Sequence, residues 1–261
     1  MVRFLFTRRW LGLLLAVVVI GVACVELGRW QFRRYAERGD SNHVTEQNLE
    51  APPVPVTRIL STTAPPSSTQ LWRVVEATGT YDADAQVLVL YRTRDGAPGV
   101  DVVVPLVTDD GTAVLVDRGW VATQGNGNQA ADVAPPPTGT VTVAGWVRSD
   151  ADGGSDQTTP SDGSVRAISS AAIAETVPYP LYDGFLDLTE EEPRPADAPE
   201  LADSPDLSAG PSFFYGVQWY FFALLAFGFW IYFAWSEYAQ QTRPGDEAAP
   251  ARAPASGGPS P

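Results

Sequence analysis

Two long apolar segments near the ends of the chain constrain its fold more than any other feature. Residues 10–27 and 213–235 are almost wholly apolar. The first segment covers about 27 Å at helical rise, close to the ~30 Å hydrocarbon core of a bilayer, and the second is long enough to span with some tilt. Both segments are therefore predicted to be transmembrane helices.

The first segment also has the charged start of a signal peptide, because Arg3, Arg8 and Arg9 come before it. Cleavage is disfavoured because the apolar run is longer than a usual signal core and no small-x-small cleavage site follows it. Gly21 also stands where a lipoprotein signal needs a large aliphatic residue before Cys24. We therefore expect an uncleaved anchor, with Cys24 as a small residue buried in the span.

The charges that flank the two segments predict their orientation. Arginines precede the first segment and follow the second, at Arg243 and Arg252, whereas the run before the second segment is acidic and rich in proline. The positive-inside rule then places residues 1–9 and a disordered tail, 236–261, in the cytoplasm. Residues 28–212 are placed outside, so that the chain is predicted to be a multi-pass protein of the plasma membrane.

Four arginines directly after the first segment conflict with that rule. They are Arg29, Arg33, Arg34 and Arg38. Either the topology is inverted, or these side chains bind something acidic, such as membrane lipid phosphates or the carboxylates of a ligand. Because a long domain is translocated largely regardless of its charge, we keep the outside placement.

The central segment is predicted to be rich in β-strands. β-branched and aromatic runs, separated by Asp, Gly and Pro turns, occupy residues 72–81, 86–92, 100–107, 112–121 and 140–149. A short helix near 169–176 and a strand at 181–189 follow, and an acidic Pro-rich linker, 190–209, returns to the membrane. The predicted fold is an α+β membrane protein in which two transmembrane helices flank an extracytoplasmic antiparallel barrel or sandwich.

Scarce residue types exclude several classes of chemistry. The chain has one Cys, one His and only the initiator Met, and all its basic residues are Arg. A zinc or copper site cannot be assembled in one chain from so few ligands, and Lys-based catalysis is excluded. His43 lies in a polar run without a Gly-x-Ser-x-Gly elbow, so we interpret it as a solvated loop residue. With a net charge of −14 repelling nucleic acid, we predict neither an enzyme nor a nucleic-acid partner.

Five short motifs stand in a specific order along the chain. They are LGRWQFRR at 27–34, GTY at 79–81, YRTRDGAPGVDVVVPL at 91–106, AVLVDRGWV at 113–121 and GPSFFYGVQWYFFA at 210–223. This ordered set resembles the surfeit locus protein 1 family of cytochrome c oxidase assembly factors, over residues 8 to about 237. The resemblance implies two transmembrane helices around a β-rich domain. It also implies a role in respiratory chain biogenesis, in which haem a is delivered to or inserted into oxidase subunit I, with haem a synthase as a further partner.

The resemblance implies roles for particular residues. The matched positions are Leu27, Gly28, Trp30, Gln31, Arg34, Arg118, Gly119, Trp120, Gly210, Pro211, Tyr215 and Trp219. Members of the family commonly carry a His directly after the Gly-Pro pair, proposed as a haem ligand, whereas this chain has Ser212. Serine is no useful axial ligand, so haem a is expected to bind transiently, with the iron held by Tyr215, His43, water or a residue of the oxidase.

Helical spacing groups the aromatic and basic residues of the two predicted helices. Tyr215 and Trp219 are four residues apart, as are Trp30 and Arg34, so each pair shares one helix face. We predict that Trp30, Tyr215 and Trp219 surround the haem ring, while Arg34 or a neighbouring arginine binds the propionates.

Each of these residues also has a plain structural interpretation. Trp and Tyr gather at membrane interfaces whatever the function, and Arg118 with Trp120 fits an arginine packed on an aromatic face. Gly28 and Gly216 fit a close approach of the two helices. At the level of the whole protein, the alternatives are a haem-free scaffold that stabilises subunit I and an unrelated two-helix envelope binding module.

Overall fold

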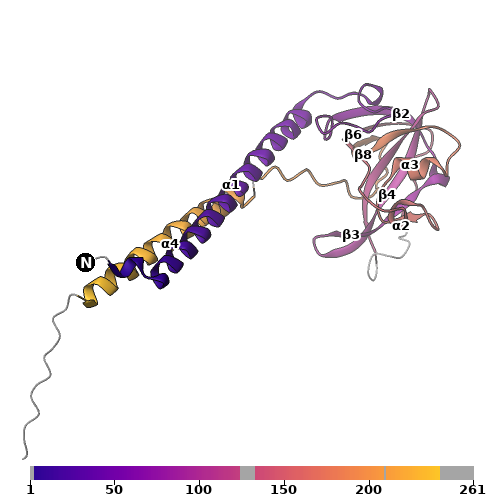
Figure 1. The fold of residues 1–261 in the computed structure, drawn as a ribbon. Coiled ribbons are helices and arrows are strands. Elements are labelled where there is room, and N and C mark those ends of the chain that lie inside the picture. Colours follow the sequence, from indigo (N-terminus) through magenta and orange to yellow (C-terminus); the bar gives the residue numbers. More distant parts are fainter. Residues whose placement is uncertain (1–2, 124–132, 209, 242–261) are drawn as a thin grey trace, which may run out of the picture. The chain divides into compact units, whose positions relative to one another are not determined.

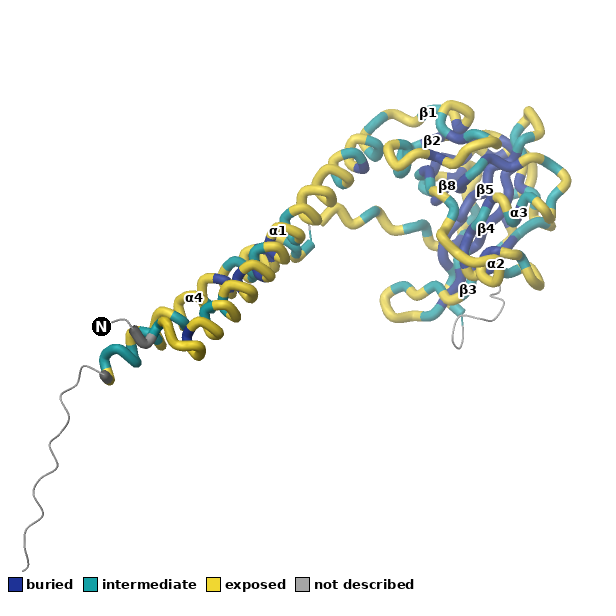
Figure 2. The backbone as a smooth tube through the Cα atoms, in the orientation of Figure 1, coloured by how far each residue is buried: buried dark blue, intermediate teal, exposed yellow. Residues whose placement is uncertain are grey.

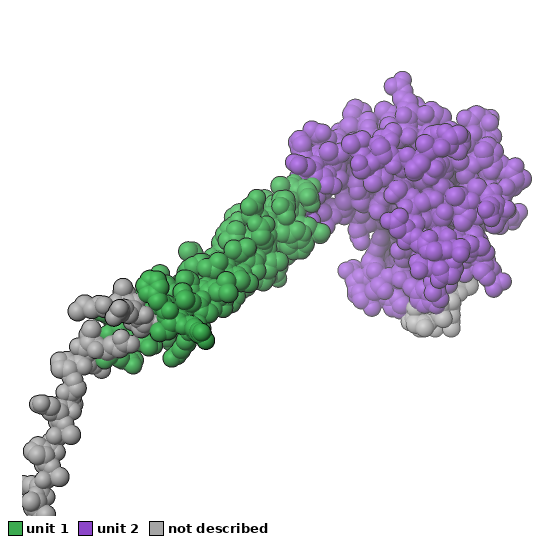
Figure 3. Space-filling model, in the orientation of Figure 1, with its two compact units in different colours: residues 1–37, 209–261 green, residues 38–208 purple. Residues whose placement is uncertain are grey.

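The computed structural model describes residues 3–123, 133–208 and 210–241. The chain divides into two compact units, which Figure 3 distinguishes by colour. Unit 1 comprises Met1–Glu37 with Ala209–Pro261, and unit 2 comprises Arg38–Ser208. Of the tail 236–261 that the sequence predicts to be disordered, residues 236–241 are instead helical, and residues 242–261 lie outside the described residues.

Unit 1 is built from two long helices. A 3₁₀ turn, η1 (Arg3–Phe6), precedes α1 (Arg8–Glu50), and α4 (Ser212–Gln241) follows unit 2. The two helices lie side by side and antiparallel, with the start of α1 beside the end of α4 (Figure 1). Both are long and apolar enough to cross a membrane, and they contain the two predicted spans. Two such helices near the ends of the chain suggest a membrane protein.

Helix α1 is longer than the sequence predicts. It continues for 23 residues beyond the end of the apolar run at 27, to Glu50. The extension is rich in helix-forming Arg, Glu, Gln and Ala, and Pro52 and Pro53 are the first prolines after it, so nothing stops the helix earlier. The interpretation of His43 as a loop residue is therefore wrong, because it lies in this extension, exposed, with its Nε2 3.0 Å from Nε2 of Gln47.

Glycines allow the two helices of unit 1 to approach closely. The ring of Tyr220 lies 2.9 Å from the point where a Cβ on Gly28 would be, and the ring of Phe32 is equally close to Gly216. An aromatic ring on one helix thus fills the space left by a missing side chain on the other. The packing interpretation of Gly28 and Gly216 is confirmed.

Unit 2 holds an eight-stranded sheet. Its strands are β1 (Val54–Pro55), β2 (Val74–Tyr81), β3 (Val87–Arg94), β4 (Ala97–Thr108), β5 (Ala113–Ala122), β6 (Thr140–Arg148), β7 (Ser164–Val165) and β8 (Leu181–Glu192). Four short helices accompany them: η2 (Val56–Arg58), η3 (Ala83–Ala85), α2 (Ser155–Thr158) and α3 (Ser170–Ala174). All six predicted strands and the predicted helix near 169–176 are present. However, β8 extends three residues into the segment that the sequence assigns to the acidic linker.

The sheet is mixed, so the expectation of a purely antiparallel arrangement is wrong. The strand order is β1-β2-β6-β8-β5-β4-β3-β7, and the pairs β1–β2, β5–β8 and β3–β7 are parallel. The long connection between β5 and β8 gives the chain room to return in the same direction. An additional antiparallel pairing of β2 with β4 links both ends of the order β2-β6-β8-β5-β4 by hydrogen bonds.

Successive residues of the central strands belong to two different apolar clusters. On β5, Val114 and Val116 belong to the larger cluster, whereas Ala113 and Leu115 belong to the smaller one, which also contains Ile173 of α3. This is the period-2 alternation of a strand with both faces covered. Figure 2 shows that the buried residues of unit 2 concentrate on these strands. Polar side chains of β5 are therefore forced into the interior.

Candidate functional site

The four site residues predicted from the sequence lie at one end of the helix pair in unit 1. This aromatic end comprises residues 28–37 of α1 and 212–220 of α4. Its packing is aromatic, because the ring centroid of Phe32 lies 5.7 Å from that of Phe213 and 6.0 Å from that of Tyr220. These contacts join α1 to α4 at this end, and we call the line of contact between the two helices the seam.

Trp30, Arg34, Tyr215 and Trp219 flank this seam and are not packed within it. The guanidinium of Arg34 lies 5.7 Å from the ring centroid of Trp30, in a cation–π contact along α1. Trp30 is 46% exposed and Tyr215 49% exposed. Trp219 is half-buried and contacts Phe222 of its own helix. The structure thus places the four residues at the same end of the pair in two groups, Trp30 with Arg34 on α1 and Tyr215 with Trp219 on α4.

These side chains offer two of the three features that a haem needs. Exposed aromatic faces suit a planar macrocycle, and Arg34 can pair with a carboxylate. The third feature, an axial ligand, is weak: Ser212 is the first residue of α4, and Tyr215 one turn later offers only a phenol. The described residues contain no group of three or more His, Cys, Asp or Glu that could hold a metal ion. His43 belongs to unit 2, where it pairs with Gln47.

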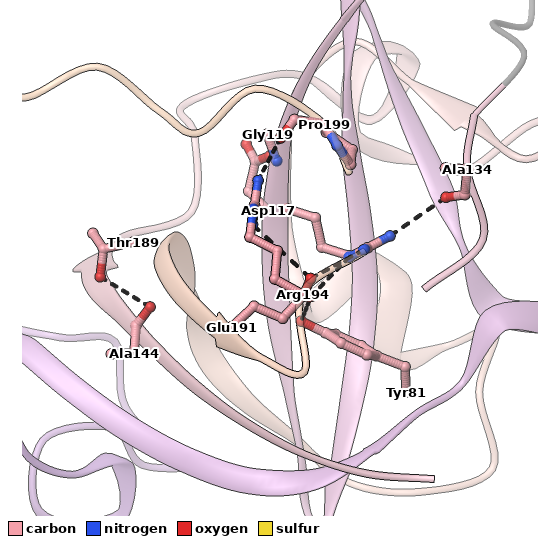
Figure 4. A network of polar contacts seen from close by, with 10 residues as sticks. Tyr81, Asp117, Gly119, Ala134, Ala144, Thr189, Glu191, Arg194 and Pro199 are labelled. Atoms are coloured by element: carbon pink, nitrogen blue, oxygen red, sulfur yellow. Dashed lines mark hydrogen bonds and ion pairs between the residues drawn. The ribbon is translucent and has the colours of Figure 1, made fainter. Parts of the chain in front are cut away.

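Arg118, the arginine of the matched Arg-Gly-Trp motif, is buried in unit 2. Its Nε and Nη2 donate to the two carboxylate oxygens of Glu191 at 3.1 and 3.2 Å, and both side chains are 0% exposed. The hydroxyl of Tyr81 donates to the same carboxylate at 2.8 Å, and the Arg118 guanidinium lies 5.4 Å from the Tyr81 ring centroid. Figure 4 shows Tyr81 and Glu191 converging. Arg118 is therefore packed on an aromatic face as interpreted, but the ring is that of Tyr81. Trp120 instead faces Arg94, whose guanidinium lies 5.7 Å from its ring centroid.

The rest of the motif holds the segment after β8 against the sheet. The backbones of Trp120 and Glu200 exchange two hydrogen bonds, of 2.8 and 2.9 Å, and Arg94 donates to the carbonyl of Leu201 at 3.0 Å. Gly119 has φ +119°, and a Cβ there would collide with the carbonyl oxygen of Glu200. A residue without a side chain is therefore required for this contact. We call residues 193–203 the strap.

A second polar cluster lies on the opposite face of β5. Asp101, Asp117 and Asp187 gather there, and Arg92 and Arg148 pair with Asp101 and Asp187 at 2.8 and 2.6 Å. Burial raises the pKa of Asp117 well above its usual value, and the charges of the other two carboxylates add to the shift. Burial also raises the pKa of Asp101 and Asp187, against the effect of their arginines. The surroundings of Asp117 thus favour its protonated form over a wider pH range than for a free aspartic acid.

Sequence reasoning missed the partner of Arg118. Glu191 stands in the run Glu190–Glu192, which composition assigns to a solvated acidic linker. The alternation of the preceding strand is misleading here, because Leu186 and Leu188 face the larger cluster and an unbroken period of 2 would bury Glu190. A register shift between Leu188 and Glu190, opposite Gly145 and Ala144, instead leaves Glu190 and Glu192 exposed and buries Glu191. A buried acid at this position would have called for a buried base, and Arg118 is such a base.

Comparison with known proteins places the motifs and both helices in one family. A sequence model described as the SURF1 family matches residues 18–224. The chain belongs to the SURF1 family. Uncharacterized SURF1-like proteins of Mycobacterium tuberculosis and Mycobacterium bovis are each 32% identical to it over 244 residues, which cover 92% of this chain and 89% of each relative.

Membership of the SURF1 family supports a role in cytochrome oxidase assembly. Proteins of the SURF1 family are assembly factors and are generally not enzymes. The matched region contains the aromatic end, Arg118, Glu191 and the strap. The SURF1 match therefore covers both the surface available to a ligand and the buried contacts that shape unit 2.

Replacement of Glu191 by Gln should destabilise unit 2 strongly. The amide cannot neutralise Arg118, which would stay buried without a counter-charge, and loss of one partner of a buried pair costs about 3–5 kcal/mol. Thermal and denaturant unfolding of the full chain in detergent would measure the loss. The neighbouring, exposed Glu190→Gln is the matched control and should change stability by less than about 0.5 kcal/mol. Equal stability of both variants would contradict a structural role for the Arg118–Glu191 pair.

Asp117 should make unit 2 less stable as the pH rises. The pKa of the Asp117 carboxyl is higher in the folded state, so the folded protein binds more protons than the unfolded chain. The contribution of this group to the stability of the fold is therefore complete below the unfolded pKa of about 3.9. It is lost as the pH rises through the folded pKa. Each pKa unit corresponds to about 1.4 kcal/mol. Asp117→Asn should therefore be more stable than the parent at pH 7 and show a flatter pH profile of the melting temperature. The exposed Asp84→Asn should leave the profile unchanged, and a lower stability of Asp117→Asn at pH 7 would show that the anion is needed.

Proposed function

We propose that this SURF1-family chain assists the delivery or insertion of haem a into subunit I of a haem–copper oxidase. The observation that carries the proposal is the exposed aromatic and basic surface of the aromatic end, which lies outside the helix seam. Aromatic side chains needed only for helix packing would be in the seam, as Phe32 and Tyr220 are. Trp30, Tyr215 and Trp219 are instead free to contact a third component.

Different side chains contact different parts of the haem in this proposal. Trp30 and Trp219 cover part of the apolar macrocycle, and Arg34 pairs with a propionate, for which its position beside Trp30 orients the guanidinium. Bound haem would supply the oxidase with its redox centre, and this chain has only to hold it and release it. Tyr215 is the candidate ligand on this chain for the iron. Weak ligation suits a carrier, because a cargo held by a strong axial ligand is slow to leave.

The proposal extends to partners and location. Subunit I is the acceptor of the haem and haem a synthase its source. Membrane lipids surround α1 and α4 in the plasma membrane. Both termini face the cytoplasm, and unit 2 lies on the outer side, in agreement with the arginines before the first span.

A haem-free scaffold is the second candidate, and Ser212 favours it. A chain that has lost the usual iron ligand of its family could retain the helix pair and unit 2 as a clamp on subunit I. Such a scaffold should purify without a chromophore and still bind the oxidase subunit. The visible spectrum of the purified protein therefore distinguishes the two candidates.

Purified from cells that make haem a, the full chain should carry haem a in its visible spectrum and in a pyridine haemochrome assay. Trp219→Ala and Arg34→Ala should each weaken haem retention about tenfold, or about 1.4 kcal/mol, and should lower the oxidase content of a deletion strain that they complement. Trp235→Ala, an exposed tryptophan near the other end of α4, is the control and should behave as the parent. A colourless protein that pulls down subunit I would establish the scaffold, and normal oxidase spectra in the deletion strain would contradict both candidates.

Ser212→His should increase haem retention and shift the Soret band, because it supplies a strong axial ligand beside the aromatic surface. Gln218→His places the same side chain at an exposed position of the same helix end and should have no such effect. Equal spectra for the two histidine variants would show that residue 212 does not face a haem.

A further inference from the structure

An apolar groove runs along the other end of the helix pair, between the first turns of α1 and the last turns of α4. Its volume is about 650 Å³, within the usual range of small-molecule sites. Leu13, Val17, Ala226 and Phe229 are among the apolar residues that line it. The polar residues Arg9 and Glu237 lie at its open end, at the start of α1 and the end of α4.

The sizes of the side chains in the seam explain why the helices part here. At Gly21 the ring of Phe227 lies 2.8 Å from the position of a missing Cβ, so the helices are in close contact. Towards the start of α1, the rings of Trp10 and Trp230 meet edge to face with centroids 6.2 Å apart. Two indoles in the seam hold the helices apart where glycine no longer allows close approach, and the groove opens beside them.

The length of the groove matches one leaflet of a bilayer. It extends from Arg9 to Ile20 on α1, about 16 Å at helical rise. A hydrocarbon core is ~30 Å thick, so the groove accommodates a chain from one side of the membrane only. A spanning helix of another protein would need a continuous groove, and the close contact at Gly21 ends this one.

The chemistry of the lining identifies the class of ligand. Among the described residues that line the groove, none is a His, Met, Cys or Tyr, so it lacks the axial ligands that haem iron requires. Its open end carries one cation, Arg9, and one anion, Glu237. A phosphate complements the guanidinium, and a primary ammonium complements the carboxylate. A phosphoethanolamine headgroup carries both charges.

We infer that this groove is a binding site for one phospholipid with a phosphoethanolamine headgroup, whose acyl chain lies along Leu13, Val17 and Ala226. The headgroup phosphate lies at Arg9 and its ammonium at Glu237. The lipid fills the space beside the indoles of Trp10 and Trp230 and so stabilises this end of the helix pair. This site is separate from the aromatic end and does not rest on the haem proposal.

Native mass spectrometry of the full chain tests the site directly. The protein is exchanged into nanodiscs of phosphatidylethanolamine and phosphatidylglycerol in equal amounts, and the lipid that stays bound after release is identified. We expect one bound lipid, with phosphatidylethanolamine retained at least fivefold over phosphatidylglycerol. Glu237→Gln should abolish this preference while an acyl chain still binds.

Val17→Phe fills the groove and should reduce lipid retention at least fivefold. Val18→Phe adds the same side chain on the adjacent, exposed position outside the groove and should retain lipid as the parent does. Three results would overturn the inference: equal retention in both Phe variants, no preference between the two lipids in the parent, or a co-purifying haem or protein that Val17→Phe removes. Helical circular dichroism of each variant would confirm that both helices are intact.

Discussion

The ion pair between Arg118 and Glu191 is the interaction on which unit 2 depends. It joins the central strand β5 to the end of β8 without access to water, and Tyr81 of β2 donates to the same carboxylate. Burial of such a pair is costly unless every partner is present. The chain that leaves Glu191 then forms the strap, in which Arg194 donates to the carbonyl of Pro199 at 2.6 Å (Figure 4). One buried charge pair thus determines where the sheet ends and how the chain continues towards α4.

In unit 1 the helices are positioned by glycines, whose lack of a side chain allows close packing. Gly21, Gly28 and Gly216 each receive an aromatic ring from the opposite helix. In a membrane, close contact of this kind is what holds helices together, because lipid is as apolar as the side chains. The seam therefore uses the small residues and their partner rings. Trp30, Arg34 and Tyr215 are left on the flanks, where a haem, a lipid or a partner protein can meet them.

The two ends of the helix pair differ in the chemistry that they offer. The aromatic end has exposed Trp30 and Tyr215 with Arg34, and it supports the proposed haem role of a SURF1-family assembly factor. The opposite end has an apolar groove with one charge of each sign. A carrier anchored in this way would keep its helices fixed at one end and present a ligand surface at the other.

Both apolar helices, all six predicted strands and the residues at the aromatic end could be predicted from the sequence. These features follow from composition and from periods of 3.6 and 2.0, which are local properties of the chain. Membership of the family could also be read from the order of short motifs. The position of the site residues on the flanks of the helices could be predicted only in part. Their spacing shows which residues share a helix face, but it does not show which face packs against the other helix.

The parallel pairing of β5 with β8, the role of Glu191 and the groove beside Trp10 could not be predicted in this way and depend on the folded chain. Arg118 and Glu191 are 73 residues apart in the chain, and no local pattern distinguishes a buried acid from the solvated acids on either side of it. The raised pKa of Asp117 likewise comes first from its burial and then from the carboxylates of Asp101 and Asp187 on two other strands. Burial and electrostatic interaction depend on what the fold brings together, and the same amino-acid types in the same local pattern would be solvated if the strands paired otherwise.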